Sequence, residues 1–194
     1  LGSLVSDYVL VATSKDVAAT TTAAPLTVTA NDAAKFVTQP EPTFNASYAG
    51  FLTGETATDL GGSLTITRSN AATNTAGDYT GVLVPSGWTS TNYAITFSAG
   101  DFSIIPANQL WVQVTNVSST YGTDVTYVVN SATYLAGDNT TIVDLTGNVS
   151  ATGNAITLSD GAGGDASFTL GALSPSLSNA GKLVVGSYQI GSVG

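Results

Sequence analysis

The stretch APLTVTANDAAKFV at residues 24–37 decides the fold, because a related stretch returns later in the chain. The second stretch is ANQLWVQVTNVSSTYG at residues 107–122, and Leu26 of the first corresponds to Leu110 of the second. In both stretches apolar side chains alternate with threonine or glutamine, which is the period of two expected of a β-strand with one buried face. An internal repeat of this kind indicates tandem modules.

Two further elements repeat in the same order. GFLTGET at residues 50–56 returns as ATYLAGDNT at residues 132–140. AGDY at residues 76–79 returns as VGSY at residues 185–188, after a longer interval than in the first copy. We therefore expect an insertion in the second copy around residues 160–165, folded as a loop or as an extra hairpin.

The ending of the first copy has its counterpart near the start of the sequence. Tyr93 begins the element YAITF, and Tyr8 begins the similar element YVLV. The interval from Tyr79 to Tyr93 equals the interval from Tyr188 to Tyr8 of a copy placed directly after this one. We infer that the sequence is one period of a head-to-tail array of paired domains, in which a following copy completes the second domain.

The repeat divides the chain into three parts. Residues 1–24 are expected to be the end of a preceding repeat, with tail strands and a linker, residues 25–106 a first β domain, and residues 107–194 a second β domain with an insertion. The second domain lacks its last strands, and we expect a strand from the following copy, or from the chain's own N-terminal segment, to complete it.

Composition favours an all-β fold. Hydrophobic residues make up 43% of the chain and charged residues 9%, and the apolar positions are mainly Val, Ile, Leu, Tyr and Phe among Thr and Ser. No helix of ordinary length fits between the strand-like runs, so we predict tandem antiparallel β-sandwich domains of Ig-like character, with a β-grasp-like or solenoid arrangement as the alternative. The runs are residues 8–12, 26–30, 63–67, 93–97, 102–105, 110–115, 125–129, 155–158 and 167–170.

Charge and residue counts exclude several functions. A net charge of −9 with only four lysines and arginines argues against a nucleic-acid partner, because there are too few cations to replace the counterions of phosphates. The absence of Cys and His removes disulfides, thiol nucleophiles, His-dependent triads and most zinc sites. There is no run of apolar residues long enough for a membrane helix. We expect a protein that is neither an enzyme nor embedded in a membrane.

These elements resemble the MBG domain repeats of large bacterial surface and secreted adhesins, including those exported by two-partner secretion. In the second copy Tyr121-Gly122 looks like the family's Tyr-Gly element, whereas the first copy has Phe36-Val37 there. The resemblance implies an extracellular stalk or filament module of an adhesin or biofilm-matrix protein at the cell surface. Its partners would be neighbouring repeats and other copies of itself, with no catalytic residue and no cofactor apart from calcium.

Three acidic residues in turns are candidate calcium ligands. Asp160 and Asp165 flank the sequence GAGG, and Asp138 precedes an asparagine. Calcium takes about six to eight oxygen ligands, so two local carboxylates are few, and aspartate is also an ordinary turn residue. A calcium-stiffened repeat is therefore an alternative function.

Two other residue types suggest further chemistry. Trp88 follows Pro85 and Gly87 in an expected loop, where a flat indole ring could stack on a sugar; packing at the end of the sandwich is the other reading. A carbohydrate-binding module with a glycan ligand is thus another alternative function. Trp111 lies in an alternating strand, which predicts a core residue. The lysines could form an isopeptide bond with an asparagine or be solvated: Lys15, Lys35 and Lys182.

Overall fold

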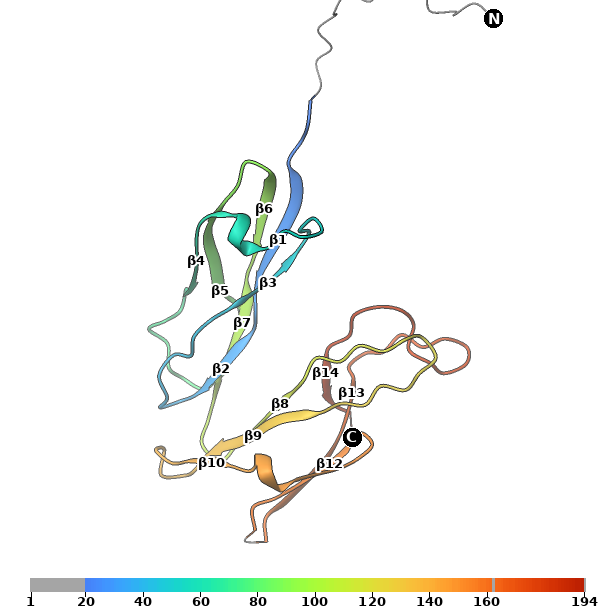
Figure 1. Cartoon of the computed structure of the whole chain (residues 1–194). Coiled ribbons are helices and arrows are strands. Elements are labelled where there is room, and N and C mark those ends of the chain that lie inside the picture. Colours follow the sequence, from blue (N-terminus) through green and yellow to red (C-terminus); the bar gives the residue numbers. More distant parts are fainter. Residues whose placement is uncertain (1–19, 162, 194) are drawn as a thin grey trace, which may run out of the picture.

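The computed structural model describes residues 20–161 and 163–193, which form two bodies of β-strands in series (Figure 1). The strand expected at residues 8–12 and most of the expected N-terminal part lie outside the described residues. The first body contains β1 (Ala24–Ala30), β2 (Ala33–Phe36), β3 (Ala46–Ala49), the 3-10 helix η2 (Ala57–Asp59), β4 (Gly61–Arg68), β5 (Gly77–Thr89), β6 (Tyr93–Ser98) and β7 (Gly100–Ile105).

The first body has two sheets, with strand orders β3-β1-β6 and β2-β7-β5-β4. The chain changes sheet twice with almost no connection, between β1 and β2 and again between β6 and β7. One hydrophobic cluster gathers around Leu26 and Val28 of β1, and the other around Phe102 and Ile104 of β7. The four side chains are 0–2% exposed, so the strands that change sheet also form the core.

The second body also has two sheets. Its elements are β8 (Leu110–Val114), β9 (Val129–Leu135), β10 (Ile142–Asp144), the 3-10 helix η3 (Thr146–Asn148), β11 (Val149–Thr152), β12 (Ala155–Ser159), β13 (Asp165–Ala172) and β14 (Ile190–Ser192). The strand orders are β10-β9-β8 and β11-β12-β13-β14. A single hydrophobic cluster, which includes Ala132, Ile156, Leu158 and Leu170, forms the core of this body.

The prediction of an all-β sandwich fold is confirmed, but two strand pairings depart from the purely antiparallel arrangement that was expected. Most strand pairs are antiparallel, but β1 pairs with β6 in parallel and β2 pairs with β7 in parallel. Parallel pairing needs a long connection between the partners, and here β3, β4 and β5 provide it. Among the described residues no helix is long and apolar enough to cross a membrane.

The sequence patterns located some strands and missed others. The runs at residues 26–30, 63–67 and 155–158 lie within β1, β4 and β12. The prediction for residues 125–128 was wrong, because β9 begins only at Val129. There the side chain of Asn154 binds the backbone instead, accepting from Tyr127 N and donating to Val125 O. The longest strand, β5, was missed because three glycines and a proline interrupt its pattern.

The separate clusters predict that the two bodies lose stability independently. Phe102→Ala empties a fully buried site in the first body and should lower its free energy of unfolding by about 3–5 kcal/mol. Amide hydrogen exchange should then speed up in β5 and β7 but stay unchanged in β12 and β13. Leu158→Ala is the matched variant and should have the reverse effect. Equal acceleration in both bodies for either variant would show a single cooperative unit.

Candidate functional site

Trp88 lies in β5, not in the loop that the sequence predicted. The indole packs against the cluster around Leu26 and is half-buried. Its Nε1 donates a hydrogen bond to the hydroxyl of Tyr48 at 3.0 Å. The preceding Gly87 has φ of 97°, and a Cβ there would lie 2.1 Å from the carbonyl oxygen of Ser63 on β4. The close approach of β4 and β5 thus requires glycine and sets the position of the tryptophan.

This packing predicts that Trp88→Ala acts on stability. Loss of the half-buried ring and of the Tyr48 hydrogen bond should lower the free energy of unfolding by about 2 kcal/mol, measured in urea. Trp88→Phe keeps a ring but not the donor and should cost about 1 kcal/mol. If Trp88→Ala kept full stability and abolished binding on a glycan array, the ring would be a sugar platform instead.

The three candidate calcium ligands lie at two different turns. Asp160 lies in the β12–β13 turn, Asp165 is the first residue of β13 directly after it, and Asp138 lies in the β9–β10 turn. The Oδ1 atom of Asp160 accepts a hydrogen bond from Gly164 N at 2.8 Å. Within residues 20–161 and 163–193, no three His, Cys, Asp or Glu side chains are placed to share a metal. Calcium binding stays a prediction.

Asp138 closes its turn with its own carboxylate. It accepts hydrogen bonds from Thr141 Oγ1 at 2.6 Å and from the backbone nitrogens of Thr140 and Thr141, each at 2.9 Å. These bonds, the Thr141 hydroxyl first, hold the pKa of Asp138 well below its ordinary value because they favour the charged form. The geometry is that of a turn in which aspartate binds the following backbone.

The described residues also contain a cluster of charges, with two buried cations around a partly exposed carboxylate, that the sequence did not reveal. Glu41 accepts hydrogen bonds from Lys35 Nζ at 2.9 Å and from Arg68 Nη2 at 2.8 Å and Nε at 3.1 Å. The two cations are 7% and 6% exposed. The guanidinium also lies 4.8 Å from the ring centroid of Phe102. Because these residues come from separate elements, no local motif could have indicated the cluster.

The cluster also shows what surrounds Lys35, for which the sequence left open an isopeptide bond or a solvated side chain. Its Nζ donates to Asn74 Oδ1 at 2.8 Å, so the lysine, an asparagine and a carboxylate meet as an isopeptide bond would require. Burial raises the pKa of Glu41, but hydrogen bonds from Lys35 and Arg68 outweigh burial and lower it. Lys35 thus forms an ion pair with Glu41 and a hydrogen bond with Asn74, and it is not the solvated lysine that the sequence also allowed. The arrangement therefore ties β2 and β4 to the intervening loops.

Glu41→Gln should destabilise the first body. It leaves two buried cations without their counter-charge and should cost about 1–2 kcal/mol, less than a fully buried pair would, because Glu41 is 39% exposed to screening solvent. The free energy of unfolding from urea melts measures the loss. Asp124→Asn is the control, since it removes the same charge from an exposed pair with Lys182 and should change stability little.

The same pair of variants gives a pH dependence with a defined sign. Since the folded-state pKa of Glu41 is lowered, its stabilisation is present above the ordinary value near 4.5 and is lost as the pH falls through the folded pKa. The stability difference between the native chain and Glu41→Gln should therefore shrink on acidification below that value. A difference that is constant with pH would contradict the ion cluster.

Two contacts join the bodies across the short connection between β7 and β8. The rings of Phe36, at the end of β2, and Trp111, in β8, meet edge to face with centroids 5.8 Å apart. Thr38 Oγ1 donates to Asn139 O at 2.7 Å. Phe36 is 4% exposed, yet it belongs to none of the three hydrophobic clusters. The prediction of Trp111 as a core residue was wrong, because its ring closes this seam instead.

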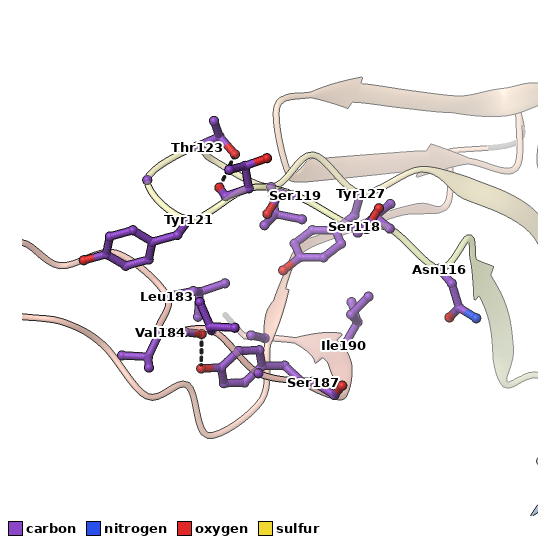
Figure 2. Close-up of a pocket in the computed structure, with 18 residues that line it drawn as sticks. Asn116, Ser118, Ser119, Tyr121, Thr123, Tyr127, Leu183, Val184, Ser187 and Ile190 are labelled. Atoms are coloured by element: carbon purple, nitrogen blue, oxygen red, sulfur yellow. Dashed lines mark hydrogen bonds between the residues drawn. The ribbon is translucent and has the colours of Figure 1, made fainter. Parts of the chain in front are cut away.

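A cavity of about 400 Å³ lies in the second body (Figure 2). Residues 116–123 form one wall and residues 183–188 the opposite one, with Tyr127, Ala172 and Ile190 also lining the space. Figure 2 shows Tyr121 and Ser118 on one segment and Leu183 and Ser187 on the other, with the space between them. The cavity contains no charged side chain among its lining residues, so it is suited to a strand or another weakly polar occupant.

Comparison with known families assigns the first body. Residues 26–103 match the family model described as MBG domain (YGX type). These residues form an MBG domain. The resemblance noted in the sequence is thus confirmed for this part of the chain. No curated protein and no solved structure matches the chain.

The match covers most of the first body. It begins at Leu26 in β1 and ends at Ser103 in β7, so it includes both parallel pairings, β1 with β6 and β2 with β7. In this MBG domain Phe36 ends β2 and is 4% exposed. Tyr121 of the second body, at the corresponding Tyr-Gly element, is 57% exposed at the rim of the cavity. The two bodies thus differ where β2 and β7 pair.

Proposed function

We propose that the chain is a structural stalk or filament module of an extracellular bacterial adhesin or biofilm-matrix protein. Its product would be length and stiffness, together with end-to-end or lateral association with other copies. The MBG domain at residues 26–103 supports a repeat module of a surface protein. The sparse charge and the many Thr and Ser residues of the chain are consistent with an exposed, uncharged polar surface.

The observation that carries the proposal is the pair of contacts beside the short connection between the bodies. Only residues 106–109 separate β7 from β8, and this connection begins with Pro106, whose ring fixes φ. The Phe36–Trp111 contact and the Thr38–Asn139 hydrogen bond lie beside the connection. A covalent link flanked by two contacts resists bending more than a flexible linker of the same length would.

Modules that each bury their own core can be added in series without creating new folding problems. The two bodies satisfy this condition, because their clusters share no residue. The length of such an array grows with the number of modules, and seams of this kind keep it extended. The carbohydrate and calcium alternatives stay predictions, since neither Trp88 nor the acidic turns show a geometry that favours them.

Small-angle scattering of chains with one, two and four copies in tandem tests this function. The maximum dimension should increase by a constant increment for each copy, as expected of a rod. Trp111→Ala in every copy should reduce the increment by opening the seam, while the cluster around Leu158 keeps each second body folded. Trp111→Phe keeps a ring and should restore most of the increment. A dimension that grows only as the square root of copy number would refute a stiff stalk.

A further inference from the structure

Several strands of the two bodies correspond, and the described residues of the second body contain no strand equivalent to β6 or β7. β1 of the first body has a partner on each edge, β3 on one side and β6 on the other. Its counterpart β8 pairs with β9 on one edge only, and no described strand pairs with the other. Leu26 and Leu110 occupy matching positions in β1 and β8. The unpaired edge of β8 is therefore where β6 lies in the MBG domain.

The other sheet shows the same pattern. The hydroxyl of Tyr79, at the start of β5, donates to Thr75 O at 2.8 Å, and that of Tyr188 donates to Val184 O, also at 2.8 Å. In both cases the acceptor lies four residues before the tyrosine. Shortly after each tyrosine a strand pairs antiparallel with an earlier one, β5 with β4 and β14 with β13. β14 thus corresponds to β5.

This correspondence explains the cavity. In the MBG domain β7 lies between β2 and β5, and its Phe102 and Ile104 are 0% and 2% exposed. In the second body the cavity lies between residues 116–123, which correspond to β2, and residues 183–188, which lead into the counterpart of β5. No described strand occupies that position. The cavity is the place of a strand equivalent to β7.

Apolar side chains around this place are left in contact with solvent. Val185 is 85% exposed, Tyr121 57% and Val184 42%, and all three line the cavity. A partner strand would cover these side chains. It would also form β-sheet hydrogen bonds with backbone groups of residues 116–123 and 183–188, which belong to no described strand. Addition of an extended segment to an open sheet edge is a common mode of recognition between chains.

We propose that residues 8–19 of a second copy of this sequence complete the second body. The YVLV element at residues 8–11 would pair in parallel with β8, as β6 pairs with β1, and the residues after it would fill the cavity, as β7 does. This proposal deepens the stalk function and rests on it, because it supplies the end-to-end joint between copies.

The proposed segment shares the spacing of two residues with β6 and β7, although Lys15 stands where the MBG domain has Gly100. Tyr8 and Asp16 are separated by the same interval as Tyr93 and Asp101. Val17 then stands where the MBG domain has its central Phe102. The parallel register of β1 with β6 pairs Thr29 with Ser98, and transferred to the second body it pairs Gln113 with Thr13.

Chain length favours a second copy over the chain's own N-terminal segment. Residues 20–36, which include β1 and β2, run from Thr20 to the seam at Phe36, and an extended chain of that length spans about 50 Å (Figure 1). Residues 11–20 can span at most about 30 Å. The segment at residues 8–11 therefore cannot reach β8 of its own chain, whereas a copy placed after the second body can.

Disulfide trapping tests the proposal, because the native chain has no cysteine. Gln113 is exposed, so Gln113→Cys leaves the second core intact, and it is mixed with a separate Thr13→Cys chain under mild oxidation. We expect a mixed disulfide dimer, identified by mass spectrometry of the cross-linked peptides. Thr22→Cys is the control for the donor chain: Thr22 is exposed but outside the segment, and it should give several-fold less mixed dimer.

A free peptide of residues 6–20 should compete and reduce the mixed dimer, whereas the same peptide in scrambled order should not. Equal yields with Thr13→Cys and Thr22→Cys would overturn the proposal. A chain carrying both Gln113→Cys and Thr13→Cys that forms only an internal disulfide would overturn the second copy as the occupant. Neither result would bear on the scattering of tandem copies, which tests the stiffness of the array. The joint between copies and the stalk function can therefore be refuted independently.

Discussion

The fold depends on strands that leave one sheet and enter the other, and on the parallel partners that accompany them. β1 and β2 cross between the sheets of the first body, and β6 and β7 follow them in parallel. Each pair satisfies backbone groups that a buried strand edge would otherwise leave without hydrogen bonds. The same strands contribute fully buried side chains, including Val28 and Phe102. Pairing and core formation are thus one constraint, and a body without the second pair retains an open edge and a cavity.

Charge plays a local part in this fold. With few cations in the sequence, the placement of Lys35 and Arg68 around Glu41 is notable, because both are buried. Arg68 also donates to the carbonyl oxygens of Ala71 and Thr73, so the cluster fixes the β4–β5 loop as well as joining strands. Its physical role is to provide hydrogen-bond donors for backbone carbonyl oxygens and for a carboxylate, which apolar packing alone could not supply. The seam at Phe36 and Trp111 plays the corresponding role between the bodies, where an aromatic contact takes the place of a shared core.

Sequence periodicity predicted strands wherever one face is buried and alternation is undisturbed, as in β1, β4, β8 and β12. It failed for β5, where Gly81 and Gly87 adopt φ of 67° and 97° and break the pattern while still allowing strand pairing. Sequence periodicity also placed Trp88 in a loop and Trp111 in the core, and both placements were wrong. The tertiary contacts of each ring, with Tyr48 and with Phe36, decide where it packs. Asp138 and Asp160 lie in turns, as aspartate often does, whereas Asp165 begins β13, and no local signal tells whether distant carboxylates converge.

By itself the sequence determined the all-β class, the MBG resemblance and the internal repeat, because strand period, turn residues and repeated motifs are local properties of the chain. Only the tertiary structure decided the parallel pairings, the Lys35–Glu41–Arg68 cluster, the seam and the cavity. Each of these brings together residues far apart in the chain. The free energy that selects them comes from burial and hydrogen bonding between whole elements, which no short stretch of sequence contains.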